Sequence, residues 1–531
     1  AMTKGSPDAV VITADDEKII REVLAPYWTG RDFTPHFIQA LPDEARNYSF
    51  GPDKTNIFRQ TAVIMSSQSM RSSQNWIIDF SKIMKHGCAG IRAEAQARLE
   101  AMTNPIVRVE NGPFLEAVIT TCNAMTTWAR RYAEKAREIA ASESNAQRKA
   151  ELLEIADVCA RVPEQPCQSF REAMQVQWFC QCMSRLEEMI GGDIGQGRMD
   201  QYLWPYYKAD IESGRLTEEK AIELFHCLWI NMMQYIQLNL SPTAAAGREG
   251  FSHHETATIG GQTREGEDAT NELSYVLLES TRGLRTSYPE LAARIHSNTP
   301  ERFLHAVVEA NKDGKGSPKI INDESVVPFY LSHGISVADA LDYAASGCME
   351  ARLPNIETHK TGNSAVNYGS IIEMTLRNGR IKIFGDHQFG PQTGDPRVWT
   401  CFDQVWNAFR IQTENVLRNI LIENAIGRQL KPRYFASPFA SMLHDLASKH
   451  CMDLQRHGEG IPGQLDLTCI DGIGGFGTAI DSLVAIKTLI FEEKKLTWDE
   501  LLTALECNWE GKEAIRQLCL NAPKFGNGIE W

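Results

Sequence analysis

Apolar residues in the first half of the chain recur at intervals of three and four positions, which is the spacing of one buried face of an α-helix. Residues 143–158 are rich in Ala, Glu, Arg and Lys and should be exposed, whereas residues 169–189 are more apolar and should be buried. The spacing predicts helices over Asp16–Tyr27, Trp76–Thr103, Phe114–Ala141, Glu143–Val158, Ser169–Met189 and Leu216–Leu240.

The pattern changes near residue 255, where short strand-like runs begin to alternate with helical stretches. This alternation is typical of parallel strands covered by helices, in a sheet that is either open or closed into a barrel. Side chains that act in such folds lie on loops at strand ends. Strands are predicted over Ala257–Gly260, Leu291–Ile295, Lys319–Asn322, Tyr343–Ala345 and Leu465–Ile470. Helices are predicted over Thr270–Arg282, Pro300–Lys312, Glu324–His333, Val405–Ala425 and Thr478–Glu493.

The chain has no linker rich in Pro, Ser or Gly, and no internal repeat of 20–50 residues. We therefore predict a single α/β domain over residues 1–531. Its helical part should cover about residues 1–250 and its strand–helix part about residues 251–531.

The net charge of the 531 residues is -14, which argues against a nucleic-acid or acidic-membrane partner. No apolar run reaches the roughly 18 residues that a membrane-spanning helix needs. The N-terminus, Ala1–Asp16, is polar and acidic and lacks the basic start and apolar centre of a signal peptide. We expect a cytoplasmic protein that is not bound to membranes.

The thirteen cysteines include no Cys-x-x-Cys pair. Cys180 and Cys182 lie two apart in a predicted helix, so their side chains point about 200° apart around the helix axis. This spacing argues against a structural zinc or iron–sulfur site and favours buried thiols in a reducing compartment. We expect no bound metal.

The stretch with the clearest candidate chemistry follows the predicted strand at residues 343–345. Gly347 allows the backbone to turn sharply just before Cys348. Cys348 and Glu350 lie two apart, so in an extended backbone a thiol and a carboxylate would face one cavity. Arg352 and His359 could add charge nearby. From these residues alone, a buried cysteine beside a surface acid remains an open alternative.

The Gly-Cys-Met-Glu sequence at residues 347–350 resembles the Gly-Cys-x-Glu signature of glycyl radical enzymes related to pyruvate formate-lyase. The resemblance covers roughly residues 60–531, and it implies a ten-stranded α/β barrel surrounded by helices, in which a cysteine loop and a glycine loop meet at the centre. Further stretches similar to the same family are Gly197–Tyr202, Pro205–Tyr207, Gly390–Pro396, Asp481–Lys487 and Asn521–Asn527.

The resemblance also implies roles. Cys348 would be the thiyl site and Glu350 the acid–base or substrate-binding carboxylate. The family's radical glycine lies within Arg-Val-x-Gly-Tyr, a stretch that this sequence does not contain. We therefore expect a shortened chain, a radical glycine on another polypeptide, or an inactive homologue, and no turnover by this chain alone.

The cofactors and partners implied by the resemblance lie outside this chain. No cofactor should bind directly, and a radical S-adenosylmethionine activating enzyme with an iron–sulfur cluster should install the glycyl radical. Relatives of this kind are commonly homodimers, and some decarboxylases carry a small extra subunit, which this sequence does not decide.

The residues after Glu350 bear on the reaction. Diol dehydratases and choline lyases typically have proline directly after this glutamate, whereas Ala-Arg-Leu-Pro-Asn at residues 351–355 looks more like the arylacetate decarboxylases. The resemblance thus favours a small organic acid that loses carbon dioxide, with Glu350 holding its carboxylate end. A lyase that eliminates across a C–O or C–N bond remains the nearest alternative.

An arylacetate needs a flat apolar wall and a partner for its phenol hydroxyl. Phe251 is the candidate wall, although plain core packing explains it equally well. His254 and His387 are candidate hydroxyl ligands, although both could be ordinary surface residues. His253 would point away from His254 on a strand, so at most one of the two should reach the cavity.

Two readings from other classes stay open. Gly472–Gly477 matches G-x-G-x-x-G before a predicted helix, as in a dinucleotide-binding loop, but the 54 residues that follow are too few for the rest of a nucleotide-binding half. A binding or regulatory subunit without turnover is the non-enzymatic alternative.

Overall fold

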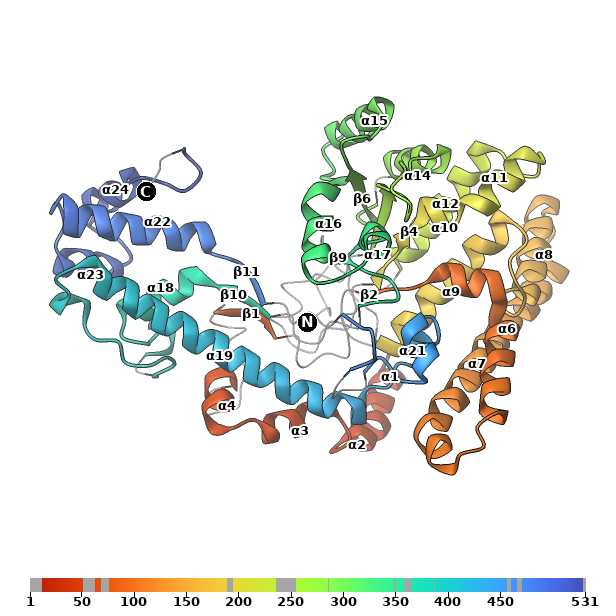
Figure 1. Ribbon diagram of the computed structural model, residues 1–531, viewed down its shortest axis with the longest axis horizontal. Helices are drawn as coiled ribbons and strands as arrows, with labels where there is room; N and C mark the ends of the chain where they lie inside the picture. The colour runs from red at the N-terminus through yellow and green to blue at the C-terminus, as the bar shows by residue number, and fades with distance from the viewer. Residues whose placement is uncertain are drawn as a thin grey trace. The chain divides into compact units, whose positions relative to one another are not determined.

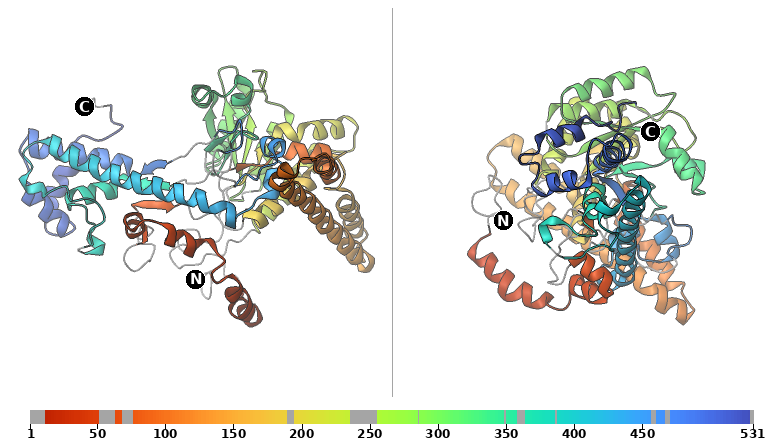
Figure 2. Two further views of the ribbon diagram at one scale, coloured as in Figure 1. Left: turned by 60° about the horizontal axis from the view of Figure 1, so that its bottom comes forward. Right: turned by 90° about the vertical axis from the view of Figure 1, so that its left-hand side faces the viewer.

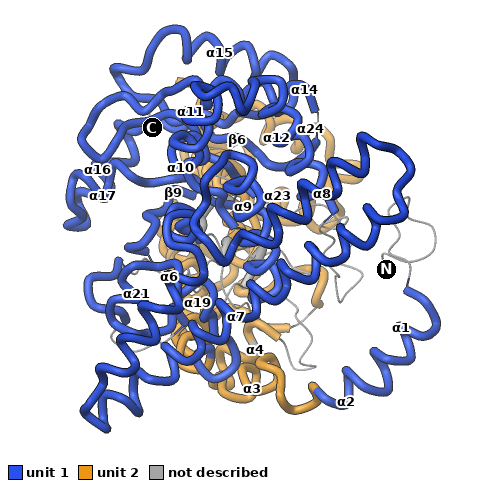
Figure 3. The backbone as a smooth tube through the Cα atoms, turned by 90° about the vertical axis from the view of Figure 1, so that its right-hand side faces the viewer, with its two compact units in different colours: residues 1–27, 71–360, 431–467 blue, residues 28–70, 361–430, 468–531 orange. Residues whose placement is uncertain are grey.

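The computed structural model describes residues 12–50, 63–67, 76–188, 194–234, 255–284, 286–347, 350–357, 364–385, 387–455, 460–465 and 470–528. The backbone divides into two compact units (Figure 3). Residues 1–27, 71–360 and 431–467 belong to the first unit, and residues 28–70, 361–430 and 468–531 belong to the second. The first unit therefore includes parts of both the predicted helical region and the predicted strand–helix region.

Helices at the start of the chain agree with the predicted segment 16–27. Helix α1 begins after Thr13, whose side chain accepts a hydrogen bond from the Asp16 amide, while the Asp16 carboxylate accepts one from the Thr13 amide. Such a reciprocal cap is a common way for a helix to begin. The elements here are α1 (Ala14–Ile19), the π-helical turn η1 (Ile20–Leu24), α2 (Ala25–Trp28), α3 (Phe33–Ala40) and α4 (Asp43–Phe50).

Four long helices form the α-helical region of the first unit. Helix α7 has Asn104 as its cap and Pro105 in its first turn, so it begins nine residues before the predicted Phe114. Figures 1 and 2 show α7 and α8 side by side. The predicted helix from residue 76 is wrong at its start, because Trp76 and Ile77 form a strand. The four helices are α6 (Phe80–Glu100), α7 (Pro105–Ser142), α8 (Ala146–Arg161) and α9 (Phe170–Glu188).

The first unit also contains a parallel sheet in the order β4-β5-β6-β7, and β2 pairs in parallel with β3. Helices join successive strands of the sheet, as the alternation predicts, and Figure 1 shows α14, α15 and α16 around it. The strands are β2 (Trp76–Ile77), β3 (Ile194–Gly195), β4 (Gly197–Arg198), β5 (Thr256–Gly260), β6 (Glu290–Ile295) and β7 (Lys319–Asn322). The helices are α10 (Met199–Tyr202), α11 (Trp204–Glu212), α12 (Glu218–Met232), α14 (Glu272–Gly283), α15 (Glu301–Lys312) and α16 (Asp323–Ser332).

A short antiparallel hairpin completes the first unit. It follows α17 (Val337–Leu341) and consists of β8 (Ala344–Ser346) and β9 (Glu350–Arg352), with Ser346 opposite Glu350. The predicted strand 343–345 is therefore one residue out of position. Two further helices of this unit are α20 (Pro438–Met442) and α21 (Asp445–His450).

The second unit is built on the three-stranded sheet β1-β10-β11, in which β10 runs antiparallel to β1 and parallel to β11. Its strands are β1 (Ile64–Ser67), β10 (Ser364–Asn367) and β11 (Ile470–Gly474). Its helices include α3 and α4, together with α18 (Tyr368–Leu376), α19 (Phe402–Tyr434, within this unit up to residue 430), α22 (Phe476–Ile486), α23 (Trp498–Glu506) and α24 (Glu513–Asn521). Its other elements are the 3-10 turns η3 (Lys382–Phe384) and η4 (Pro396–Val398) and the π-helical turn η5 (Lys487–Glu492).

The glycine-rich stretch 472–477 does not form the loop that a dinucleotide needs. Its first three residues belong to β11, so Gly475 is the single residue between that strand and α22. A Cβ atom at Gly475 would lie 2.2 Å from the Asn367 side-chain oxygen, so this glycine allows close packing within the unit. The strand lies later than the predicted 465–470, of which residues 466–469 are outside the described residues.

None of the described helices combines the length and apolar character that a membrane crossing requires.

Candidate active site

The candidate catalytic pair lies in the β8–β9 hairpin. Glu350 is partly buried, begins β9 and pairs with Ser346 across the hairpin. Gly347 has a φ of 60°, a left-handed conformation that glycine adopts without strain. Cys348 and Met349 lie outside the described residues. The expectation that the Cys348 thiol and the Glu350 carboxylate face one cavity therefore stays a prediction, while both strands that flank them are defined.

Two buried hydroxyls attach β8 to β5. The Thr258 hydroxyl oxygen accepts a 2.8 Å hydrogen bond from the Ala345 amide, and the Thr256 hydroxyl donates one to the Gly347 carbonyl. Both threonines have 0% exposure. The Ser346 hydroxyl adds a 3.3 Å bond to the carbonyl of Trp76 on β2. The strand that leads to Cys348 is thus held by side chains as well as by its pairing with β9.

A buried arginine holds the residue just before β8. The Arg294 guanidinium donates to both Asp323 carboxylate oxygens, at 2.9 and 2.8 Å, and to the Tyr343 carbonyl at 2.6 Å. The Tyr343 hydroxyl donates to Asp323 at 2.6 Å. Burial raises the pKa of the Tyr343 hydroxyl. Burial is the largest single influence on the pKa of Arg294 and lowers it, but the hydrogen bonds and charges of Asp323 and Tyr343 together outweigh burial and raise the pKa. Both donors therefore keep their protons.

The strand that leaves the loop is held by a second ion pair. Arg352 donates to one Glu357 oxygen at 3.1 Å, and the other oxygen accepts from the Leu353 amide at 2.7 Å and the Tyr330 hydroxyl at 3.3 Å. The Arg352 side chain is buried, yet its Nε and Nη2 atoms have no hydrogen-bond partner among the described residues. This arginine is therefore only partly satisfied.

A buried histidine supports the same segment. The Nδ1 atom of His444 accepts a hydrogen bond from the Ala447 amide, so its Nε2–H donates to the Glu357 carbonyl at 3.2 Å. Burial lowers the pKa of His444 to about 4. The ring is therefore neutral near pH 7, and it connects the start of α21 to the segment that follows β9.

The predicted substrate-binding residues are only partly described. Phe251 and His254 lie outside the described residues, so their roles stay predictions. His387 belongs to the second unit, is partly exposed and packs edge-on against Phe389 at 4.4 Å between ring centroids. The Phe389 contact is compatible with ordinary packing, and a role of His387 in binding a substrate also stays a prediction.

The threonines and Arg294 were missed in the sequence. Thr256 and Thr258 are residues that favour strands and lie in a strand-like run. Their hydroxyl groups can be assigned a role only once their hydrogen bonds to β8 and Gly347 are known. None of the cysteines that the structure describes forms a disulfide, and no cluster of three His, Cys, Asp or Glu side chains suited to a metal occurs in the described ranges.

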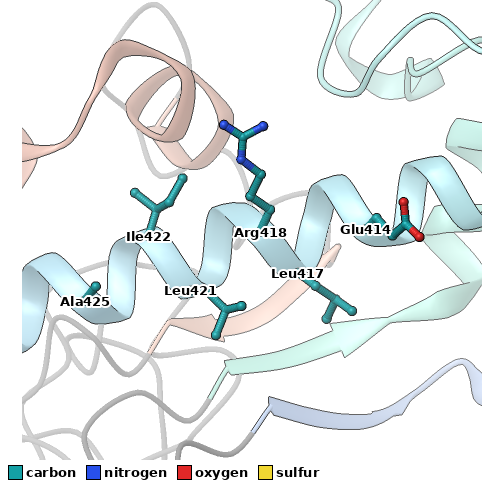
Figure 4. Close-up of a pocket in the computed structure, with 6 residues that line it drawn as sticks. All are labelled: Glu414, Leu417, Arg418, Leu421, Ile422 and Ala425. Atoms are coloured by element: carbon teal, nitrogen blue, oxygen red, sulfur yellow. The ribbon is translucent and has the colours of Figure 1, made fainter.

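A surface groove in the second unit has a different character (Figure 4). Its lining comes from one helix, α19, and Arg418 there forms a 3.4 Å ion pair with Glu44. No thiol or histidine lines it, so it offers no counterpart to the hairpin chemistry. The lining residues are Glu414, Leu417, Arg418, Leu421, Ile422 and Ala425.

Comparison with known proteins agrees with the resemblance that the Gly-Cys-Met-Glu sequence indicated. The chain is 45% identical over 522 residues to the isethionate sulfite-lyase of Oleidesulfovibrio alaskensis, covering 98% of this chain and 62% of that protein. The structure matches the B12-independent glycerol dehydratase of Clostridium butyricum with a TM-score of 0.88 and 30% identity, covering 98% of this chain and 64% of that one. The 4-hydroxyphenylacetate decarboxylase glycyl radical subunit of Clostridioides difficile is 24% identical, over 95% of this chain and 60% of that protein.

The fold and the Gly-Cys-Met-Glu sequence motif place this chain in the class of glycyl radical enzymes. The chain belongs to the pyruvate formate lyase-like family, because the sequence model of that family matches residues 1–531. The predicted α/β fold of pyruvate formate-lyase type is confirmed. The chain spans 62% of the length of the curated sulfite-lyase that it matches.

Decarboxylation, the reaction favoured from residues 351–355, is not supported by these comparisons. The sulfite-lyase shares 45% of its matched residues with this chain, whereas the decarboxylase subunit shares 24%. The eliminating-lyase alternative fits better. A few residues beside Glu350 are a weaker guide to the reaction than similarity along the whole chain.

Proposed function

We propose that this chain is the cysteine-bearing part of a glycyl radical lyase that cleaves a C–S bond in isethionate, or 2-hydroxyethanesulfonate, and releases sulfite. The observation that carries the proposal is 45% identity to an isethionate sulfite-lyase over 98% of this chain. Because the chain spans 62% of that relative, the activity belongs to the complete protein.

Cys348 and Glu350 would divide the chemistry between them. The Cys348 sulfur takes a hydrogen atom from the hydroxyl-bearing carbon of isethionate, and Glu350 takes the proton of that hydroxyl. The neighbouring C–S bond then breaks, and its electron pair leaves with sulfite. The remaining carbon radical takes a hydrogen atom back from the Cys348 thiol. The Glu350 proton passes to sulfite or solvent, so isethionate is converted into acetaldehyde and bisulfite.

The hairpin suits this division of labour. A three-residue link between paired strands places few rotatable bonds on either side of Cys348, and buried hydroxyls hold the strand that precedes it. Glu350, at the start of the other strand, is partly exposed and so can exchange a proton. A glycyl radical in the complete protein supplies the oxidising equivalent for the Cys348 thiol.

The partners follow from the same proposal. A radical S-adenosylmethionine activating enzyme would install the glycyl radical, and the complete protein would be a homodimer. The substrate is a small organic anion, a sulfonate in place of the carboxylate that the sequence suggested.

The test uses the complete protein, activated anaerobically with its activating enzyme. Isethionate, glycerol and 4-hydroxyphenylacetate are supplied separately, and sulfite, aldehyde and carbon dioxide are measured. We expect equal amounts of sulfite and acetaldehyde from isethionate, and little product from the other two. Carbon dioxide from the arylacetate, with no sulfite from isethionate, would overturn the proposal.

Dehydration is the second candidate, because the glycerol dehydratase of Clostridium butyricum matches the structure with a TM-score of 0.88. Aldehyde formed from glycerol, without sulfite from isethionate, would favour it. Both reactions eliminate a group next to a hydroxylated carbon, so both use the same roles for Cys348 and Glu350.

A further inference from the structure

The two faces of strand β5 differ in a way that burial does not explain. Ala257 and Ile259 point to one face and join the main hydrophobic core. Thr256 and Thr258 point to the other face and are equally buried, with 0% exposure. A strand that is buried on both faces in a parallel sheet is usually apolar throughout. The two hydroxyls therefore need a structural or functional reason.

Hydrogen bonding to the hairpin supplies that reason. The backbone groups of β5 already pair with β4 and β6, so they cannot hold a further strand. The hydroxyls of Thr256 and Thr258 reach the Gly347 carbonyl and the Ala345 amide instead. Because these two threonines are two positions apart, they engage β8 at two matching points.

The bond from Thr256 is the more informative of the two. The Gly347 carbonyl belongs to the same planar peptide group as the nitrogen of Cys348. Holding this carbonyl therefore fixes the orientation of the peptide plane from which Cys348 extends. Gly347 itself is a glycine with a φ of 60°, so without such a bond its backbone has unusual freedom to rotate.

We propose that Thr256, assisted by Thr258, is a positioning residue that orients the Cys348 loop for hydrogen-atom transfer. The proposal rests on Cys348 being the thiyl site of the proposed function. Hydrogen-atom transfer needs the sulfur in contact with the substrate C–H bond, and a displacement of about 1 Å can slow an enzymatic step by about 100-fold. Thr256 acts through the loop and does not touch the substrate.

The experiment compares three variants of the complete, activated protein. T256V removes the hydroxyl and keeps the branched shape, whereas T256S keeps the hydroxyl. T281V is the matched control: Thr281 is buried on α14, and its hydroxyl donates to the Leu278 carbonyl at 2.9 Å. The readouts are glycyl radical content by electron paramagnetic resonance, Tm, kcat per radical, KM, and the deuterium isotope effect on kcat.

For T256V we expect unchanged radical content, a kcat per radical lowered by about 10- to 100-fold and KM altered by less than about threefold. The isotope effect on kcat, with substrate deuterated at the hydroxyl-bearing carbon, should rise because hydrogen transfer becomes slower. T256S should restore most of kcat. T281V should have a similar change in Tm to T256V without a loss of kcat.

A kcat per radical in T256V equal to that of the unaltered protein would overturn the proposal. So would an equal loss in T281V, because it would indicate general destabilisation. If T256V does not fold, the same measurements are made on T258V. A loss of kcat per radical in T258V supports the proposal, and an unchanged value overturns it. If the unaltered protein converts glycerol and not isethionate, the proposed substrate fails, while the threonine variants are compared on glycerol.

Discussion

The two strands that flank Cys348 are held in different ways. On the entry side, Arg294 and Asp323 bind each other and Tyr343 through four short hydrogen bonds, all in the buried interior. On the exit side, after Cys348, the Nε and Nη2 donor atoms of Arg352 have no partner among the described residues. The comparison indicates that β8, the strand before Cys348, is held more firmly than β9, the strand after it. Substitutions beside β9 should therefore cost less stability than substitutions beside β8.

The residues between the two strands should have the largest effect. C348S removes the thiol that takes the hydrogen atom, so we expect turnover of the complete protein to fall by more than about 1,000-fold. The glycyl radical should still form, because Cys348 is not its site. Radical content and sulfite release are the two measurements. Normal turnover would contradict the mechanism.

E350Q is the matched variant on the exit strand. It keeps the size of the side chain and removes the proton acceptor, so a loss of about 100- to 10,000-fold in kcat is expected. Loss of turnover in C348S with full turnover in E350Q would confine the chemistry to the cysteine and assign the hydroxyl proton to another group.

The entry-side arginine should have the largest effect on stability. R294M leaves the buried Asp323 carboxylate with the Tyr343 hydroxyl as its one side-chain donor among the described residues, and breaking a buried ion pair typically costs about 3–5 kcal/mol of unfolding free energy. Chemical denaturation of the complete protein measures it. R302M is the control, because Arg302 and Glu272 are 68% and 63% exposed and such pairs contribute less than about 1 kcal/mol. Equal losses in both variants would remove the distinction between buried and exposed pairs.

The exit-side histidine should make stability depend on pH. The pKa of His444 is about 4 in the fold against 6.5 for an ordinary histidine, so its contribution is complete above pH 6.5. As the pH falls from 6.5 towards 4, the unfolded chain gains a proton that the fold excludes, and about 3 kcal/mol is lost.

H444N retains a side chain that can cap α21, and it should flatten this dependence. The measurement is the unfolding free energy at several pH values between 4 and 7. H333N, at an exposed histidine, should leave the slope unchanged. An unchanged slope in H444N would mean that other groups cause the acid sensitivity.

Periodicity in the sequence predicted three strands of the parallel sheet in the first unit. The strand at residues 319–322 matches β7, and those near 257 and 291 match β5 and β6 within one residue. Alternation works here because each strand is short and bounded by polar turns; β5 and most of β6 are buried, whereas two of the four residues of β7 are exposed. The start of α7 was missed, although Asn104 before Pro105 is a visible capping signal.

The elements and residue roles that the sequence did not predict depend on pairing between distant parts of the chain. Trp76 and Ile77 continue a helical pattern, and only their pairing with β3 makes them a strand. The Cys348–Glu350 motif was visible because it is local. The roles of Thr256 and Arg294 were not, because each depends on a partner far along the chain.

The smallest effect is expected at the exit-side arginine. R352M removes one bond to Glu357, which keeps the Leu353 amide and the Tyr330 hydroxyl as donors. It also removes the buried Nε and Nη2 donor atoms, which have no partner within the part of the chain that the structure describes, and an unsatisfied buried donor costs about 1–3 kcal/mol. These opposing effects should leave a net loss of about 1 kcal/mol, well below that of R294M, when both are measured by denaturation at pH 7. A loss as large as that of R294M would show that both strands hold the loop equally.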